Sequence, residues 1–223
     1  MNKIISQIES ASHIEIEVTE ELLALGSALY TYILTRHKKV SFVCKTKEVN
    51  LKYSFLPWFE KLRATNYSSA DLNLNLQNSF LEFFNTLKSL NVKINPKMAT
   101  ALYAALILET DNFTNSKTDG IFFAIASELI EYGADYKLCI QYCVKRATLS
   151  EFRLRAIMFK NMTLIENANI AAFKISEDEL KASGTISDDI QEIMKDSFGL
   201  EYVKKAILVN EDNKIIKTLE KER

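Results

Sequence analysis

The sequence predicts an α/β protein in which regular structure dominates. Only 5 Gly and 2 Pro occur among 223 residues, and 48% of the residues are hydrophobic; this composition favours packed helices and strands over long irregular linkers. Polar and apolar residues alternate over 12–18, a helical pattern follows from Thr19, and 40–44 has the character of a second strand. Strand, helix and strand at this spacing predict a βαβ unit and a parallel sheet.

The middle of the chain is predicted to be mostly helical. Thr19 is expected to cap the helix that contains Gly26, where a glycine costs about 1 kcal/mol relative to alanine, so close packing or a ligand is expected there. Asn95-Pro96 is a strong helix start, and Gly133 is a typical helix end. The expected helices cover residues 2–10, 19–33, 79–90, 95–108, 119–132 and 135–162, whereas 56–78 shows no clear period.

The C-terminal part has a different pattern. Residues 170–175 and 206–209 are expected to be strands around a helix over 187–197, and a turn at 210–213 leads into 214–217. This region is predicted to be a second, small α+β piece.

Charge and cysteine content restrict the function classes. The formal net charge is −1, from 28 basic and 29 acidic residues, which argues against nucleic acid as a partner. The longest apolar run, 98–108, is shorter than the roughly 18 residues of a membrane span, and no signal peptide is evident. Three cysteines and no secretion signal predict a cytoplasmic protein. Cys139 and Cys143 lack further ligands at zinc spacing and are expected to be half-buried.

Several segments resemble, in order, the bacterial DHH-family phosphoesterases of the oligoribonuclease and phosphoadenosine-phosphate phosphatase type. They are ALGSALY at 24–30, FLP at 55–57, ALYAALILET at 101–110, ASELIEYGAD at 126–135 and LSEFRLR at 149–155. In that family, two divalent ions held by carboxylates and histidines activate a water that attacks the phosphate. Four motifs supply the ligands, and one of them is Asp-His-His.

The resemblance implies that most of these ligands are missing here. The first motif's His falls on Glu17, its two Asp fall on Glu21 and Leu23, and the last Asp of the family falls on Glu109. No Asp-His-His occurs, since His13 and His37 are the two histidines and neither is in a matching context. The residues that would carry that motif are expected to be deleted after 55–57, and the family's Gly-Gly-His segment is also absent.

Glu17, Glu21 and Glu109 are nevertheless expected to converge if the fold is kept. The neighbours of this relic cleft would be Gly26, Ser27, Thr110 and Asp111, with Ser27 capping or packing rather than acting as a nucleophile. The two interpretations are a relic site for one Mn²⁺ or Mg²⁺ and three acids lining a solvated cleft. The second is preferred because neither a histidine ligand nor the Asp-His-His motif accompanies these acids. Trp58, with Phe55 and Phe59, is expected to pack in the core rather than form an exposed aromatic patch.

The expected organisation is a reduced DHH-type α/β domain with a parallel sheet flanked by helices (1–134), a linking helix (135–163) and a remnant of the C-terminal substrate-binding domain (164–223). The expected function is that of a catalytically inactive pseudoenzyme without a cofactor, which binds an unknown protein partner as a scaffold, chaperone, assembly factor or regulatory factor. The alternatives are a metal-dependent phosphodiesterase or nucleotidase with a rewired carboxylate site, and a nucleotide-binding sensor. A homodimer stays open, because the family often pairs through its catalytic domain.

Overall fold

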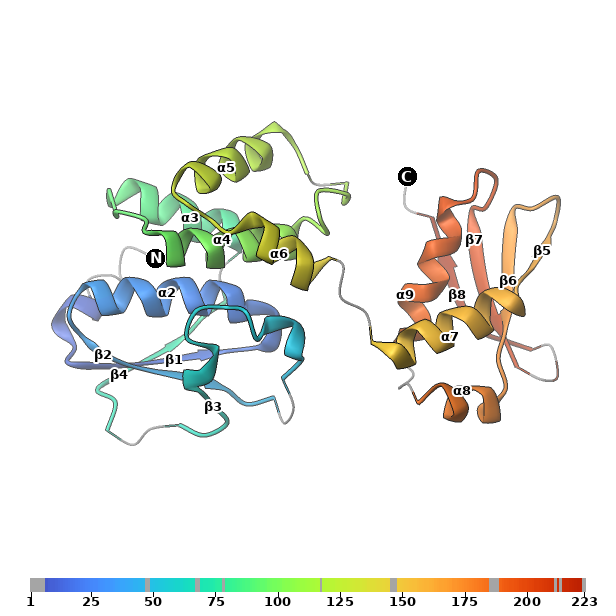
Figure 1. The fold of residues 1–223 in the computed structure, drawn as a ribbon, viewed down its shortest axis with the longest axis horizontal. Coiled ribbons are helices and arrows are strands. Elements are labelled where there is room, and N and C mark those ends of the chain that lie inside the picture. The colour runs from blue at the N-terminus through green and yellow to red at the C-terminus, as the bar shows by residue number, and fades with distance from the viewer. Residues whose placement is uncertain are drawn as a thin grey trace. The chain divides into compact units, whose positions relative to one another are not determined.

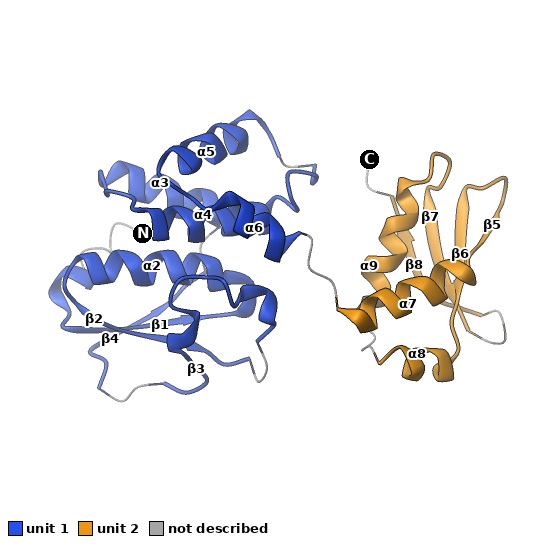
Figure 2. Cartoon of the chain, viewed as in Figure 1, with its two compact units in different colours: residues 1–146 blue, residues 147–223 orange. Residues whose placement is uncertain are grey.

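The chain forms two compact units, residues 1–146 and 147–223 (Figure 2). Each unit has its own buried hydrophobic cluster. The computed structural model describes residues 7–46, 49–66, 69–77, 79–116, 118–144, 148–184, 189–210, 212 and 214–221.

Unit 1 is built on a four-stranded, fully parallel sheet. Its strands are β1 (His13–Val18), β2 (Lys39–Cys44), β3 (Leu62–Arg63) and β4 (Leu72–Asn75), in the order β3-β2-β1-β4. The βαβ unit predicted from 12–44 is confirmed, because α2 (Leu23–Thr35) connects β1 to its parallel neighbour β2. β3 and β4 lie within the stretch for which the sequence predicted no element.

The helices of unit 1 form layers over one side of this sheet. They are α2, α3 (Phe80–Ser89), α4 (Pro96–Glu109), α5 (Gly120–Glu131) and α6 (Tyr136–Cys143), and Figure 1 shows all of them on the same side. The expected start of α4 and the expected start and end of α5 are confirmed: Asn95 Oδ1 accepts a hydrogen bond from the Met98 N–H, Asp119 caps α5, and Gly133 has a φ of +88°. A parallel sheet flanked by helices is therefore confirmed.

The start of α2 differs from the prediction. A 3₁₀ turn, η1 (Glu20–Leu22), precedes the α-helix, and the Thr19 side chain makes no capping hydrogen bond. The helix predicted over 2–10 is present at 7–10, and the rest of it lies outside the described residues.

Gly26 explains how closely α2 can approach the sheet. A Cβ atom at this position would lie 2.7 Å from Cε2 of Phe42 and 2.9 Å from Cγ1 of Val18. Of the two expected reasons for this glycine, close packing and a ligand, the structure shows close packing against Phe42 and Val18.

A short irregular segment packs Trp58 against α2. Two further 3₁₀ turns, η2 (Leu51–Tyr53) and η3 (Phe59–Lys61), flank it. The Trp58 ring stacks on Tyr30 with the centroids 5.4 Å apart, and its Nε1–H donates to Thr31 Oγ1 at 2.9 Å. Phe55, Trp58 and Phe59 are half-buried against the core, as expected from the sequence.

Unit 2 is an α+β structure, as the sequence predicted. Its sheet has the order β5-β6-β7-β8, with a parallel pair at the centre and an antiparallel strand on each edge. A capping box at Ser176, in which Ser176 and Glu179 bond each other's backbone N–H, starts a helix that the sequence analysis missed. The elements are α7 (Leu149–Lys160), β5 (Thr163–Ile165), β6 (Ile170–Lys174), α8 (Glu177–Ser183), α9 (Asp189–Asp196), η4 (Ser197–Gly199), β7 (Lys205–Val209) and β8 (Ile215–Glu220).

The single linking helix predicted over 135–163 is wrong. α6 ends with a cap at Val144, and α7 begins after Thr148, whose backbone is extended (φ −80°, ψ 159°). The Thr148 side chain accepts the Glu151 N–H at 3.1 Å, so a new helix starts there. α6 packs on α4 in unit 1, and α7 packs on α8 and α9 in unit 2. The boundary between the units therefore falls inside the predicted linker.

In the part of the chain that the structure describes, no helix combines the length and the apolar character needed to cross a lipid bilayer.

Candidate functional site

The carboxyl ends of β1, β2 and β4 meet at one edge of the unit 1 sheet. Ligands of open parallel α/β sheets bind at this edge, so it is the first place to examine. Side chains alternate along β1: Ile14, Ile16 and Val18 join the core, and His13, Glu15 and Glu17 lie on the opposite face.

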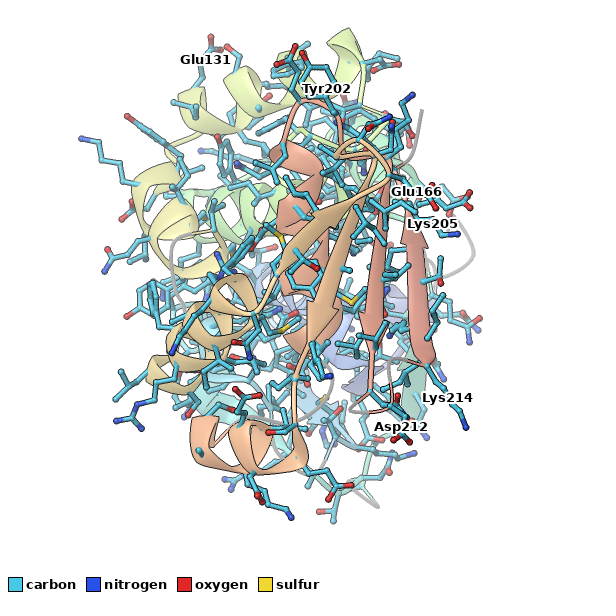
Figure 3. The ribbon with its side chains drawn as sticks, turned by 90° about the vertical axis from the view of Figure 1, so that its right-hand side faces the viewer. Glu131, Glu166, Tyr202, Lys205, Asp212 and Lys214 are labelled. Atoms are coloured by element: carbon cyan, nitrogen blue, oxygen red, sulfur yellow. The ribbon has the colours of Figure 1, made fainter. Side chains whose placement is uncertain are left out.

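Glu17 forms hydrogen bonds with two neighbours on that face. Figure 3 draws the ribbon with the side chains whose placement is described. Its Oε1 accepts a hydrogen bond from Lys45 Nζ at 2.7 Å, and its Oε2 accepts one from Asn66 Nδ2 at 3.1 Å. The Lys45 bond, followed by the Asn66 bond, lowers the pKa of this carboxyl below its ordinary value. Glu17 is therefore an ionised partner in a surface ion pair.

Asn66 links Glu17 to a second, fully buried acid. The same Nδ2 donates to Glu15 Oε1 at 2.6 Å, and Glu15 is only 1% exposed. Because a buried carboxylate without donors would be costly, Asn66 stabilises this face of the sheet.

The other two positions of the first motif lie in different environments. Glu21 is exposed in η1, whereas Leu23 is buried at the first turn of α2. Leucine has no donor atom, so the second position cannot ligate a cation.

Glu109 has a structural partner at the start of α3. Its Oε2 accepts the backbone N–H of Phe80 at 2.7 Å, while its own carbonyl oxygen accepts from Asn115 Nδ2 at 2.8 Å. The carboxylate therefore accepts a hydrogen bond from one of the backbone N–H groups that have no partner within the helix at its start.

The predicted cleft neighbours also have local structural roles. Thr110 is buried; its hydroxyl donates to the Leu106 carbonyl at 2.7 Å and accepts the Phe113 N–H at 3.1 Å. Asp111 is exposed with a φ of +47°, and its carbonyl oxygen accepts from the Thr114 hydroxyl. Ser27 is buried beside Gly26 and donates to the Pro57 carbonyl at 2.7 Å.

The structure does not bring Glu17, Glu21 and Glu109 together. Among the described residues, which include all three, no group of three or more His, Cys, Asp or Glu side chains could hold a metal ion. The convergence expected from the resemblance is not observed. The residues present do not fit an Mn²⁺ or Mg²⁺ centre, since Glu17 and Glu109 already bind N–H groups and Leu23 offers no oxygen.

A buried pair formed by His13 and Ser41 on the same face was not anticipated. His13 Nδ1 lies 3.0 Å from the Ser69 carbonyl oxygen, and Nε2 lies 2.7 Å from Ser41 Oγ. In the tautomer with the proton on Nδ1, that nitrogen donates to the Ser69 carbonyl, and Nε2 accepts from the Ser41 hydroxyl. This is the hydrogen bond of a nucleophile and its base, but both side chains are buried, and they join β1 to β2. The signal in the sequence was the polar alternation of 13, 15 and 17.

The cysteines are free thiols. Cys143 is half-buried on α6, as expected, whereas Cys139 on the same helix is fully buried. Burial raises the pKa of Cys143 to about 11.

Comparison with known proteins finds a similarity of fold. No family model and no curated protein matches the sequence. The crystal structure of an exopolyphosphatase-related protein from Bacteroides fragilis superposes with a TM-score of 0.74 at 13% identity, covering 95% of this chain and 79% of that one. A Methanococcus jannaschii protein of family II inorganic pyrophosphatase type covers 89% of this chain and 83% of its own at 11% identity, but its TM-score of 0.31 supports no argument.

Identity this low is evidence of fold and not of activity. Together with the parallel sheet and its helices, the first comparison shows that the chain shares the α/β fold of the exopolyphosphatase-related protein.

Proposed function

We propose that this protein binds another protein and does not hydrolyse phosphate esters. The observation that carries the proposal is the use made of the inherited ligand positions. Glu17 is held by Lys45 and Asn66, Leu23 is in the core, and Glu109 caps α3. On this proposal the protein is a pseudoenzyme that acts as a scaffold, chaperone, assembly factor or regulatory factor.

The chemistry of the missing reaction supports the proposal. In two-metal hydrolysis, oxygen ligands of the protein hold both ions close together. The two ions then stabilise the attacking and the leaving oxygen. A carboxylate that already accepts an ammonium or a backbone N–H would have to release that donor before it could bind a cation. Glu17 and Glu109 would each have to release a donor, and Leu23 cannot bind a metal ion at all. Little of the rate acceleration that two metal ions provide would therefore remain.

A surface on α5 supports protein binding. Phe123 and Ile130 are seven residues apart, so they lie on one face of the helix, and they are 55% and 41% exposed. The small Ser127 lies between them, and the Phe113 ring stacks on Phe123 with the centroids 4.9 Å apart. Exposed apolar groups held in a fixed position favour a protein contact.

Hydrolysis assays test the proposal directly. The full-length protein, with excess Mn²⁺, is incubated with short oligoribonucleotides, phosphoadenosine phosphate and polyphosphate. Glu109→Gln is compared, because glutamine still accepts the Phe80 N–H but loses the charge, and the exposed Glu60→Gln is the matched control. We expect no turnover above the Glu109→Gln background. Metal-dependent turnover that Glu109→Gln abolishes and Glu60→Gln retains would reject the proposal.

That outcome would instead support the second candidate, a metal-dependent phosphoesterase with a rewired carboxylate site. The fold shared with an exopolyphosphatase-related protein favours it. The third candidate, a nucleotide-binding sensor, predicts stabilisation without turnover. A nucleotide at 100 times its dissociation constant adds about 2.7 kcal/mol to the free energy of unfolding, which a thermal shift detects.

The α5 surface can be tested on the partner itself. A protein captured by the wild type should be lost when Phe123 and Ile130 are both changed to serine. Ile216→Ser, on the exposed edge of unit 2, is the control for a general loss of apolar surface. Equal capture by all three proteins would exclude α5 as the contact.

A further inference from the structure

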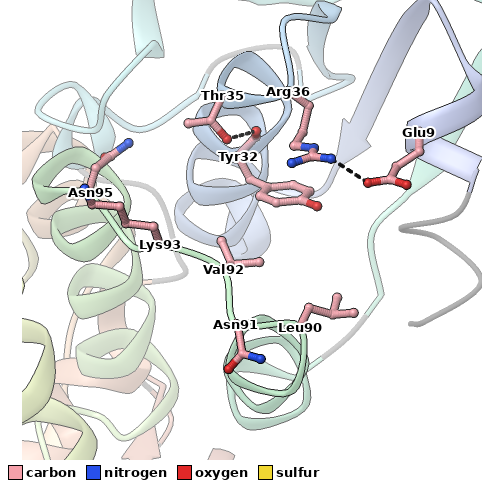
Figure 4. A pocket seen from close by; sticks show the side chains of 9 residues that line it. All are labelled: Glu9, Tyr32, Thr35, Arg36, Leu90, Asn91, Val92, Lys93 and Asn95. Atoms are coloured by element: carbon pink, nitrogen blue, oxygen red, sulfur yellow. Dashed lines mark hydrogen bonds and ion pairs between the residues drawn. The ribbon is translucent and has the colours of Figure 1, made fainter.

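A cavity of about 550 Å³ opens on unit 1 at the end of the sheet remote from Glu17 (Figure 4). Its lining comes from Glu9, from the last turn of α2 and from the connection between α3 and α4. Glu9 precedes β1 and Arg36 precedes β2, so the cavity lies at the amino ends of these parallel strands. Glu17 is at the carboxyl end of β1, and the cavity is therefore separate from the candidate site.

The cavity contains a buried hydroxyl to which the described residues offer no hydrogen-bond partner. Tyr32 is 5% exposed, and its phenol points into the cavity between Arg36 and Leu90 (Figure 4). Within the described residues, this hydroxyl makes no hydrogen bond. An unmade hydrogen bond at a buried polar group costs about 1–3 kcal/mol. A ligand that accepts from Tyr32 would recover part of that cost.

Burial raises the pKa of Tyr32; the Arg36 guanidinium opposes this effect and the Glu9 carboxylate adds to it. The hydroxyl is therefore protonated at neutral pH and is available as a donor.

The charged groups of the lining carry one net positive charge. Glu9 is neutralised by Arg36, with Oε1 and Nη2 2.7 Å apart. Asn95 uses its Oδ1 to accept the Met98 N–H, and this bond leaves its NH₂ group to donate to a ligand. Lys93 has no ion-pair partner in the part of the chain that the structure describes. The lining thus combines the net positive charge of Lys93 with the apolar side chains of Leu90 and Val92.

We propose that this cavity binds a small organic anion, a carboxylate or a phosphate monoester, with an apolar body. Its oxygens accept from the Tyr32 hydroxyl and from Lys93, and the apolar body packs on Leu90 and Val92. The volume is within the range of roughly 300–1,000 Å³ that small-molecule sites occupy. This binding is independent of the proposed protein-binding function, because it uses none of the residues at the carboxyl edge or on α5.

The test is a titration of the uniformly ¹⁵N-labelled full-length protein, at constant ionic strength, with three probes of similar shape: benzoate, phenyl phosphate and benzylamine. At least one of the two anions should shift the amide signals of residues 32–36 and 90–95, and benzylamine should not. The relative affinity of the two anions identifies the anionic group. Absence of shifts in both segments, or equal binding of benzylamine, would overturn the proposal.

Variants distinguish the cavity from general charge attraction. Tyr32→Phe should weaken the binding of the anion about fivefold, the value of one ordinary hydrogen bond, and Lys93→Gln should also weaken it. Lys61→Gln, an exposed lysine elsewhere on unit 1, should bind as the wild type does. If Tyr32→Phe or Lys93→Gln binds like the wild type, or Lys61→Gln weakens binding as much as Lys93→Gln, the inference is wrong.

The free protein gives a second readout. Because the Tyr32 hydroxyl has no partner among the described residues, Tyr32→Phe should leave the Tm of the free protein unchanged or raise it. A lower Tm would mean that the hydroxyl is already bonded, and the inference would be withdrawn.

Discussion

Gly26 determines how α2 lies on the sheet, because its missing side chain makes room for Phe42 and Val18. We predict that Gly26→Ala destabilises the protein by about 1–3 kcal/mol, since overpacking of a core exceeds the gain of about 1 kcal/mol in helix propensity. The free energy of unfolding in urea measures the change. Gly120→Ala is the control, because no atom lies within 4 Å of the Cβ it adds. A Gly26→Ala protein as stable as the wild type would show that Phe42 and Val18 can shift to accommodate the added methyl group.

Asp71 produces a pH dependence at the start of β1. Its carboxylate accepts the backbone N–H groups of Ser12 and His13, at 2.9 and 2.8 Å, and these bonds lower its pKa below the ordinary 3.8. A lowered pKa gives stability that is present above the ordinary value and is lost as the pH falls through the value in the folded state.

We therefore predict that Asp71→Asn is less stable than the wild type at about pH 6, and that the difference shrinks at a pH well below 3.8, once the pH has fallen through the lowered pKa of Asp71 in the folded state. Urea unfolding of both proteins at the two pH values measures this. A difference that does not change with pH would show that the asparagine fails for a reason other than charge.

The positions of the site residues could be predicted from the sequence, but their partners could not. Glu17 binds Lys45 and Asn66, which are 28 and 49 residues away, and Glu109 binds the N–H of Phe80, 29 residues away. Such pairs arise only when the sheet and helices pack, and no local pattern announces them. The resemblance identified the residues at the old ligand positions, but local patterns did not show that they had been given structural roles.

Among the elements, α3 and α4 are joined by the capping contact of Glu109. We predict that Glu109→Ala lowers the free energy of unfolding by about 1 kcal/mol, the usual value of a lost helix cap. Glu109→Gln should lose less, because its amide oxygen still accepts the Phe80 N–H. Urea unfolding of the two variants measures both values. Equal losses would mean that the charge, and not the hydrogen bond, stabilises the start of α3.

The elements that were predicted correctly have strong local signals, and those that were missed had signals that were overlooked. β1 and β2 follow from alternation and β-branched residues, and α4 follows from Asn95-Pro96. Thr148, with Glu151 three residues on, marked the start of α7, and Ser176 with Glu179 marked α8 in the same way. The continuous apolar pattern across 135–162 obscured the first of these. β4 is the short alternating run Leu72–Asn75, inside a stretch that otherwise has no period.

At the scale of the whole molecule, the chain consists of two units with separate cores. The core of unit 1 centres on β1, α2 and α4, and that of unit 2 on Phe173, Met158 and Ile193. We predict that residues 1–146 and 147–223 each fold when produced alone. The amide NMR spectrum of each fragment should overlay on the corresponding signals of the full chain. A fragment with collapsed signal dispersion would show that its core depends on the other unit.

Trp58 is the chain's single tryptophan and lies in unit 1, where its ring contacts Tyr30 and Lys97, with Lys97 Nζ 4.3 Å from the ring centroid. Unit 2 therefore contributes no tryptophan fluorescence, whereas the circular dichroism signal comes from the secondary structure of both units. A denaturation followed by both signals separates the two halves optically, with no label and no added residue: the emission curve belongs to unit 1, and whatever the dichroism curve adds belongs to unit 2.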